Sequence, residues 1–363
     1  MAARPLVVIT TRLPPQTCGI GTYSWLLHKH WPDRSAAVEF LVMEGAAGAD
    51  PLRERDRVTA FNGNAAALAR ELERIGAADV LLHYAGRAYQ RLGCPWWMPG
   101  VLARWKSKFT GARLLIVFHE IPGEFPITSL HFWLGKLSSH IIRRLASIAD
   151  LTVTNTAHHA AKLRQISGRQ EIHLLPVASN IETAPETSEP RLRTEFLVFG
   201  LPFGRWQTLQ TFASHLRQWH AEGRLTKLHL VGPHDDEFSL RAEEVTRAWG
   251  DRTAIVQHGT LPSPEVAALL RRVRFALTNV SETTWSKSSA FMAAAANECS
   301  VVIHSTPPES VPLCHAVGAA EVNAIADAEL ARRSEALADW YRANADWPVL
   351  ASRIAALLDQ ELP

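Results

Sequence analysis

The sequence predicts an α/β protein of two doubly wound domains, each a parallel sheet covered by helices on both faces. Short apolar runs alternate with segments of helical periodicity along all 363 residues. Such alternation is typical of parallel strands joined by crossover helices. It stops once, in the polar, proline-containing stretch Ser179–Glu195, and then starts again. We therefore expect two domains that face each other across a cleft.

In the first half, each expected strand is a short apolar run and each expected helix has apolar residues three and four positions apart. The strands are Leu6–Thr10, Val38–Met43, Val80–Tyr84, Leu114–His119, Leu151–Asn155 and Ile172–Val177. The helices are Tyr23–Trp31, Asn64–Ile75, Val101–Lys108, Gly135–Ile148 and His158–Ile166. Asn64 suits an N-cap because its side-chain oxygen accepts a backbone N–H.

The second half repeats the same two patterns. Its strands are Phe196–Phe199, Leu228–Val231, Ala254–Gln257, Phe275–Asn279 and Val301–Ile303. Its helices are Thr208–His220, Phe238–Trp249, Pro264–Val273, the alanine-rich segment before Val301, Ala328–Asn344 and Trp347–Leu358. We expect an N-terminal domain over residues 1–182 and a C-terminal domain over residues 193–340. A terminal helix over residues 341–363 is expected to pack back toward the N-terminal domain.

The composition gives no sign of a nucleic-acid-binding, disulfide-rich or membrane-spanning protein. A net charge of +2 gives no charge-based reason to expect nucleic acid or bulk membrane attraction. The cysteines, Cys18, Cys94, Cys299 and Cys314, are scattered and indicate reduced thiols, not a disulfide framework or a zinc site. The start of the chain reads as a strand, and no run approaches the ~20 apolar residues that cross a bilayer. We expect a cytoplasmic protein; peripheral contact at the inner membrane face is left open.

The stretch Ser281–Ile303 contains the strongest candidate for an anion site. Hydroxyl residues that suit an N-cap (Ser286, Ser288 and Ser289) precede an alanine-rich helix, and Lys287 lies among them. A helix start has unpaired backbone N–H groups and a partial positive charge, which both favour an anion. The alternative is an ordinary capped helix packed on a sheet.

Ligands of parallel α/β sheets bind at the carboxyl ends of strands, so residues that follow strands are candidates. In the first half, Gly19 and Gly21 open a helix in a loop that suits close backbone approach to an anion; a structural turn is the alternative. His119, beside Glu120, follows another strand and can act as a base or hydrogen-bond partner. His83 is a second histidine of this kind, and a structural histidine is the alternative for both.

In the second half, Arg205 ends a glycine-flanked loop after the first strand, where its guanidinium suits a diphosphate; a solvated surface arginine is the alternative. Gly232 follows the next strand and precedes an acidic run, His234–Glu237, which we interpret as a helix start and not a metal site. Gly259 and Thr260 follow the third strand and are placed to present backbone to a nucleobase.

These motifs, in this order, resemble the glycogen-synthase-like (group 1) retaining glycosyltransferases with the GT-B fold, over nearly the whole chain. The segments that carry the resemblance are CGIGTY, FHE, IADLTVTNTAHHAAKLRQ, FGLPFGR, HLVGPHDD, HGTLPSPEVAALLRRVRFALTNVSE and KSSAFMAAAANECSVV. The resemblance implies two Rossmann-like domains, a nucleotide sugar bound mainly by the second, and an acceptor bound mainly by the first.

The resemblance also assigns roles. It implies that Arg205 and Lys287 hold the donor diphosphate, that Glu282 contacts the transferred sugar, and that His119 contacts donor sugar or acceptor. Gly19 and Gly21 match the loop near the diphosphate.

The family's ribose-binding glutamate falls at Ala290, and its following glycine and proline fall at Glu298 and Ser300. Loss of a charged hydrogen bond weakens binding by roughly 1.5–3 kcal/mol. Ser288 and Ser289 are the candidate substitutes for that carboxylate.

The sequence thus predicts a metal-independent, retaining glycosyltransferase without a cofactor. Its donor is a UDP- or GDP-linked hexose, and its acceptor is a sugar or a lipid-linked glycan. The alternatives are a catalytically weakened or inactive binding or scaffold protein of the same fold, and a sugar-nucleotide epimerase. Two aromatic pairs, Trp96–Trp97 and Phe132–Trp133, suit an acceptor sugar, a membrane face or buried packing.

Overall fold

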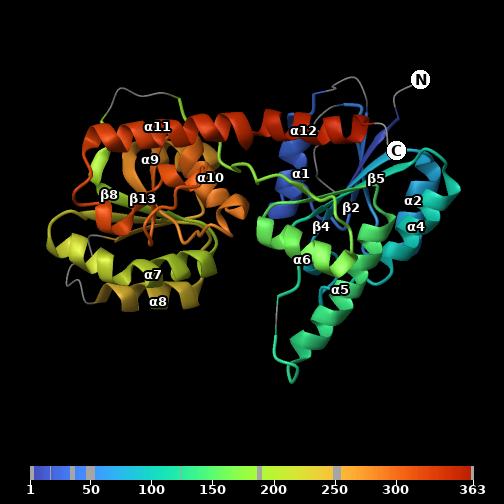
Figure 1. The fold of residues 1–363 in the computed structure, drawn as a ribbon, viewed down its shortest axis with the longest axis horizontal. Helices are drawn as coiled ribbons and strands as arrows, with labels where there is room; N and C mark the ends of the chain where they lie inside the picture. The colour runs from blue at the N-terminus through green and yellow to red at the C-terminus, as the bar shows by residue number, and fades with distance from the viewer. Residues whose placement is uncertain are drawn as a thin grey trace. The chain divides into compact units, whose positions relative to one another are not determined.

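The computed structural model describes residues 4–16, 18–32, 37–45, 54–123, 125–185, 190–247 and 255–360. The chain divides into two compact units. Unit 1 comprises Met1–Pro176 and Trp347–Pro363, and unit 2 comprises Val177–Asp346. Each unit contains a parallel sheet flanked by helices, so the predicted α/β class and the two doubly wound sheets are confirmed (Figure 1).

Unit 1 contains a seven-stranded sheet in the order β3-β2-β1-β4-β5-β6-β7, and every pairing within it is parallel. The strands are β1 (Leu6–Thr10), β2 (Val38–Val42), β3 (Arg57–Ala60), β4 (Asp79–Tyr84), β5 (Arg113–Phe118), β6 (Leu151–Thr154) and β7 (His173–Leu174). The central strands β1, β4 and β5 are almost wholly buried. Burial on both faces explains why they are continuous apolar runs.

Helices cover both faces of this sheet. They are α1 (Gly19–Lys29), α2 (Ala65–Ile75), α3 (Gly86–Tyr89), α4 (Met98–Lys108), α5 (Leu130–Ile148), α6 (Ala157–Ser167) and α12 (Trp347–Asp359). The last helix, α12, joins unit 1 although unit 2 precedes it in the chain. Trp347 lies edge-to-face on Tyr23, with ring centroids 5.0 Å apart. Arg113 Nη1 donates to the carbonyl oxygen of Gln360 at 2.6 Å.

Unit 2 contains a six-stranded parallel sheet in the order β10-β9-β8-β11-β12-β13. The strands are β8 (Leu192–Phe199), β9 (Lys227–Val231), β10 (Ile255–Gly259), β11 (Val273–Leu277), β12 (Ser300–Ile303) and β13 (Val317–Gly318). The α-helices are α7 (Pro202–Ala221), α8 (Asp236–Thr246), α9 (Ser263–Arg272), α10 (Ser289–Ala296) and α11 (Asp327–Asn344). The short 3-10 helices are η3 (Trp285–Lys287), η4 (Leu313–His315) and η5 (Ala319–Glu321).

Two hydrophobic clusters lie on opposite faces of the second sheet. Phe196 packs with Phe212 of α7, whereas its neighbour Leu197 packs with Phe291 of α10. Successive side chains of a strand point to opposite faces, so one buried strand contributes to both clusters. The alternation of apolar runs and helices in the sequence reflects this arrangement.

Several helices begin earlier than predicted. Helix α1 begins at Gly19, α5 at Leu130 and α7 at Pro202, where the sequence indicated loops. In α7 a proline occupies the first turn, which suits its fixed φ and missing N–H. In α5 the side chain of Ser129 accepts from the N–H of His131.

Three short elements, β3, β13 and α3, were not predicted, because they are too short to show a clear period. The predicted helix end at Trp249 and strand start at Ala254 lie outside the described residues.

The strand order places a switch point in each sheet. In unit 1 it lies between β1 and β4, and in unit 2 between β8 and β11. Connections leave the sheet in opposite directions on the two sides of such a point, which opens a crevice at the carboxyl ends of the two strands. In unit 2 the segments next to this switch point are the start of α7 after β8, with Arg205, and the segment after β11, with Lys287.

Two departures from the family pattern are stabilised by local contacts. Glu298 takes the left-handed position after α10, with φ 53°, where helices usually end in glycine. Its carboxylate forms ion pairs with Arg271 at 2.8 Å and Arg342 at 3.6 Å. Ser300 is buried, and its hydroxyl lies 2.7 Å from that of Ser334. Both residues therefore have structural partners.

Substitution of Glu298 tests this backbone strain. Glu298→Ala is expected to lower the free energy of unfolding by about 1 kcal/mol more than Glu298→Gly. Both variants lose the ion pairs with Arg271 and Arg342, but only glycine relieves the left-handed conformation. Urea denaturation followed by circular dichroism measures both variants against the wild type. Equal losses in the two variants would contradict the strain argument.

Candidate functional site

The carboxyl ends of β8, β9 and β10 are drawn together by two backbone hydrogen bonds. The N–H of Gly200 donates to Val231 O at 3.1 Å, and the N–H of Gly232 donates to Gly259 O at 2.8 Å. Gly232 has φ +142°, and a Cβ there would overlap the carbonyl oxygen of Gly200. Only glycine fits this position. Gly259, which the sequence placed after the strand, is the last residue of β10, and Thr260 follows it exposed.

Arg205 lies in the first turn of α7 and not on a loop, so the predicted loop position is wrong. It is only 3% exposed, so the alternative of a solvated surface arginine is wrong as well. Its Nη2 donates to Pro233 O at 2.5 Å, and its guanidinium lies 4.2 Å from the centre of the Phe238 ring. A Cβ on Gly232 would lie 2.9 Å from its Nη1. The guanidinium is therefore held against the backbone that follows the carboxyl end of β9.

The guanidinium of Arg205 has unused hydrogen-bonding capacity. Its Nε is buried and has no hydrogen-bond partner among the described residues. Burial lowers the pKa of Arg205, and the nearby carboxylate of Asp235 opposes this. Buried donors of native proteins are nearly always satisfied, so this unpaired N–H leaves a place for a partner that the described residues do not supply, such as a water molecule or an anion.

The acidic run after β9 forms a helix start, as predicted. Asp236 and Glu237 lie in the first turn of α8, and Asp235 Oδ1 accepts from the N–H of Phe238 at 2.8 Å. Carboxylates are favoured there by the helix dipole. Among the residues that the structure describes, no group of three or more His, Cys, Asp or Glu side chains is arranged to hold a metal ion.

The segment after β11 lies on the other side of the switch point. Ser288 caps α10, because its hydroxyl accepts from the N–H of Phe291 at 3.2 Å, and Ser289 is the first helical residue. Lys287 is exposed, and its ammonium has no hydrogen bond or ion pair to any described residue. A backbone hydrogen bond also holds this turn in place: the N–H of Val177 donates to Ser286 O at 2.8 Å. Within the described part of the chain, Lys287 therefore provides an unpaired cation next to the capped start of α10.

Glu282 is exposed and contacts the segment that follows β12. Its Oε1 accepts from the hydroxyl of Ser310 at 3.3 Å. Thr211 of α7 donates to Asn279 Oδ1 at 3.3 Å, which links α7 to the residues after β11. The structure thus brings Arg205 together with Gly232 and Gly259, and it places Glu282, Lys287, Ser288 and Ser289 in the neighbouring segment.

In unit 1, the two histidine candidates form one cluster. Nδ1 of His83 lies 3.0 Å from Nε2 of His119, and the rings are stacked with centroids 5.3 Å apart. Tyr23 of α1 meets both rings edge-on, at 5.4 Å and 5.1 Å. Burial lowers the pKa of His119 to about 4. Burial, and the proximity of His119, keep the pKa of His83 well below its ordinary value. Both imidazoles are therefore neutral at pH 7.

The two glycines at the start of α1 have different environments. A Cβ on Gly21 would overlap the carbonyl oxygen of Arg12, so this glycine is required by close backbone packing. A Cβ on Gly19 would have no heavy atom within 4 Å. Close packing of the turn therefore explains the glycine at position 21. At position 19 no packing contact requires glycine, and the space beside the helix start is open. Cys18 lies just before it, with its sulfur 2.8 Å from the Thr11 hydroxyl.

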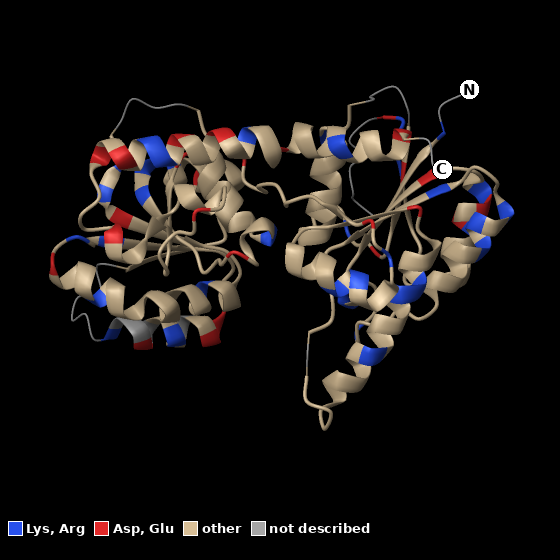
Figure 2. Ribbon diagram, in the orientation of Figure 1, with Lys and Arg blue, Asp and Glu red and all other residues tan. Residues whose placement is uncertain are grey.

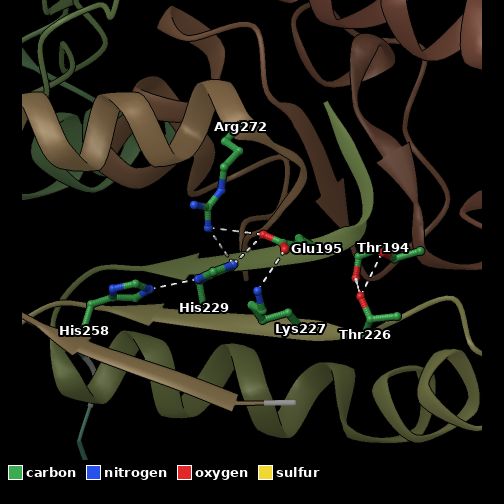
Figure 3. Close-up of polar contacts among 7 residues, drawn as sticks. All are labelled: Thr194, Glu195, Thr226, Lys227, His229, His258 and Arg272. Atoms are coloured by element: carbon green, nitrogen blue, oxygen red, sulfur yellow. Dashed lines mark hydrogen bonds and ion pairs between the residues drawn. The ribbon is translucent and has the colours of Figure 1, made fainter. Parts of the chain in front are cut away.

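Sequence reasoning missed a polar network in the second sheet (Figure 3). His229 Nε2 lies 2.8 Å from Glu195 Oε2, and His229 Nδ1 lies 2.8 Å from His258 Nε2. Lys227 and Arg272 also contact the Glu195 carboxylate, at 3.2 Å and 3.3 Å. Burial raises the pKa of Glu195, but the hydrogen bonds from His229 and Lys227 leave it below its usual value. The sequence signal for this network is that polar residues interrupt the apolar runs of β8 and β9.

Protonation of His119 is expected to destabilise the fold. Its pKa is about 4 in the folded chain and 6.5 without the fold, so the unfolded chain binds more protons between these values. The free energy of unfolding should therefore fall by about 1–2 kcal/mol between about pH 7 and about pH 5 through this group. Urea denaturation across this range measures the slope. His119→Gln should flatten it, and His140→Gln, which changes an exposed histidine of α5, should not. Equal slopes in the wild type and His119→Gln would contradict the assignment.

No protein-family model and no curated protein matches this sequence. Solved structures do match along nearly the whole chain. The N-terminal domain of Candida albicans trehalose-6-phosphate phosphatase is 12% identical with a TM-score of 0.68, covering 98% of this chain and 97% of that one. Sucrose-phosphate synthase from Thermosynechococcus elongatus is 14% identical with a TM-score of 0.68, covering 98% of each chain. HepE from Anabaena, in complex with UDP and glucose, is 12% identical with a TM-score of 0.63, covering 99% and 100%.

Identities this low establish the likeness of the fold alone. The chain has the GT-B fold, which the sequence resemblance implied.

Proposed function

We propose that the protein is a retaining glycosyltransferase that moves a hexose from a nucleotide diphosphate sugar to a sugar or lipid-linked acceptor. The observation that carries this proposal is the buried Arg205 guanidinium at the switch point of unit 2. Its Nε has no partner among the described residues, and it lies behind the glycine-bounded ends of β8 and β9. Glycines let backbone approach an anion closely, and a guanidinium binds two phosphate oxygens at once.

In this proposal, unit 2 binds the donor. Arg205 and Lys287, with the α10 start at Ser288 and Ser289, hold the diphosphate and stabilise the negative charge that grows on it as the sugar leaves. Because Arg205 is held in place before reaction and Lys287 adds a second cation, we propose that no metal ion is required. Glu282 positions the transferred sugar, as the family resemblance implies.

The nucleotide base is assigned to the edge of the same sheet. Gly232, Gly259 and Thr260 end neighbouring strands and present backbone there. The donor is UDP- or GDP-linked; HepE, which shares the fold, binds UDP and glucose in its structure. The absence of a carboxylate at Ala290 predicts weaker contact with the ribose than in the family pattern.

Unit 1 is assigned the acceptor. His119 is neutral at pH 7, so it lines the reaction centre as a hydrogen-bonding imidazole and not as a cation. His83 contacts its Nε2 and thereby favours one tautomer and one ring orientation. Gly19 offers open backbone at the start of α1, near the donor phosphates in the family pattern. We propose a cytoplasmic protein with peripheral contact at the inner membrane face.

Ala290 supports a second candidate, a binding or scaffold protein of this fold without transfer activity. A thermal-shift screen against UDP-, GDP- and ADP-sugars separates the two functions. Stabilisation by one donor, followed by its slow hydrolysis, is the result expected of a transferase. Failure of every nucleotide to raise the melting temperature would favour the scaffold.

Substitution of the two cations tests the donor site. Lys287→Ala and Arg205→Lys are each expected to lower turnover about 100-fold, because the first removes a charge and the second removes the planar fork. The measurement is turnover of the donor found in the screen. Arg217→Ala changes an exposed arginine of the same helix and should leave turnover unchanged. Full activity in both site variants, with unchanged melting temperatures, would refute the assignment.

Introducing a carboxylate tests the missing ribose contact. Ala290 is the second residue of α10, where an acidic side chain also suits the helix dipole. Ala290→Glu is expected to tighten donor binding about tenfold, which corresponds to one added charged hydrogen bond. Isothermal titration with the donor measures the change, and Ala290→Gln gives the contribution of size without charge. An affinity that does not rise would place the ribose elsewhere.

A further inference from the structure

The N-terminal end of α5 carries an exposed apolar surface that the donor and acceptor assignments do not use, and its role bears on the peripheral membrane contact proposed above. We call it the α5 tip, and it consists of Phe125, Ile127, Leu130, Trp133 and Leu137. These side chains are between 43% and 68% exposed. Figure 1 shows this end of α5, with the loop before it, projecting away from the other helices of unit 1. A cluster of large exposed apolar side chains on a protruding element marks an interaction surface.

A second exposed tryptophan lies close to the α5 tip in the fold. The thiol of Cys94 donates to the carbonyl oxygen of Leu134 at 3.5 Å, so the turn before α4 lies against α5. Trp96 follows two residues later and is 69% exposed. Tryptophan is enriched at membrane–water interfaces, because its ring has an apolar body that faces the membrane and a polar N–H that faces water.

The exposed side of α5 changes character along its length. Leu130, Trp133 and Leu137 lie three and four positions apart, and His140 and Arg144 continue the same exposed stripe. With a rise of 1.5 Å per residue, the apolar part spans roughly 10 Å and the basic end follows roughly 10 Å further on. Amphipathic elements that bind bilayers insert their apolar side roughly 5–10 Å and keep basic side chains at the headgroups.

The charged residues of helix α5 are all basic, and Glu124 directly precedes Phe125 in the sequence. Residues 125–149 contain Lys136, Arg143 and Arg144 and no aspartate or glutamate (Figure 2). On the C-terminal side, the next acidic residue, Asp150, is paired with Lys106 at 2.5 Å. Lysine and arginine beside an apolar surface are attracted to anionic lipid headgroups. Among the described residues, no helix is long and apolar enough to cross a membrane.

We propose that the α5 tip docks on an anionic phospholipid bilayer, with the apolar side chains in the interface and Lys136, Arg143 and Arg144 at the headgroups. A second copy of the chain is the competing occupant, but a self-complementary contact would bring the basic residues of two tips together. The bilayer supplies opposite charge instead. Docking uses none of the residues assigned to the donor, so it stands or falls separately from transfer activity.

Vesicle flotation of the full-length protein, without nucleotide or acceptor, tests the proposal. Wild-type protein is expected to float with phosphatidylcholine vesicles that contain phosphatidylglycerol and not with phosphatidylcholine alone. Leu130→Ser combined with Trp133→Ser should reduce binding at least tenfold, because these side chains enter the interface. Leu240→Ser, which removes an apolar side chain 64% exposed on unit 2, is the matched control and should bind like the wild type.

The charge contribution is measured separately. Lys136→Gln combined with Arg144→Gln should weaken binding several-fold. Raising the salt concentration from about 0.1 M to about 1 M should also weaken wild-type binding, because the Debye length falls to ~3 Å. Arg143 is kept because its Nε donates to Ile166 O at 2.7 Å. Ile127→Ser, on the loop before α5, gives a second apolar test if the double variant melts early.

Two results would overturn the proposal. One is wild-type protein that stays with the soluble fraction in the presence of anionic vesicles. The other is binding that persists unchanged in both the Leu130/Trp133 double variant and Ile127→Ser. Sedimentation velocity identifies the competing occupant: a dimer that Trp133→Ser dissociates, without any vesicle binding, would assign the α5 tip to self-association.

Discussion

The close approach of Gly232 to the carbonyl of Gly200 is the constraint on which the second unit's candidate site depends. A side chain at Gly232 would overlap that oxygen and separate the ends of β8 and β9. The same approach leaves room for the guanidinium of Arg205, which reaches across to Pro233 O and stacks on Phe238. Backbone contact at the strand ends therefore determines where the buried cation of the candidate site can lie.

Most of the fold was predictable because buried parallel strands are continuous apolar runs. The central strands of both sheets were recognised in this way. Prediction failed where tertiary contacts outweigh the local pattern. Helix α7 begins at Pro202 in a segment rich in glycine and proline, which also reads as a loop. Helix α5 begins at Leu130, where exposed apolar side chains obscure the amphipathic period. Edge strands of a few residues, such as β13, carry too few side chains to be distinctive.

The sequence selected the members of the candidate site but did not predict their contacts. Position after strands, together with the family resemblance, selected Arg205, Lys287 and His119. The burial of Arg205 required knowledge of how α7 and α8 pack, which no local pattern contains. The pairing of His83 with His119 depends on the register of β4 and β5. His229 was missed because one polar residue within an apolar strand gives no indication of its partners.

The path of the chain has a consequence for its synthesis. Helix α12 completes unit 1, where Trp347 lies against Tyr23. All of unit 2, from Val177 to Asp346, is synthesised between these two residues. Unit 2 is therefore an insertion, and it emerges from the ribosome complete while unit 1 still lacks its last helix. Domains usually mature in order from the N-terminus during translation. Here unit 1 begins to emerge first, and its helix α12 emerges only after the whole of unit 2.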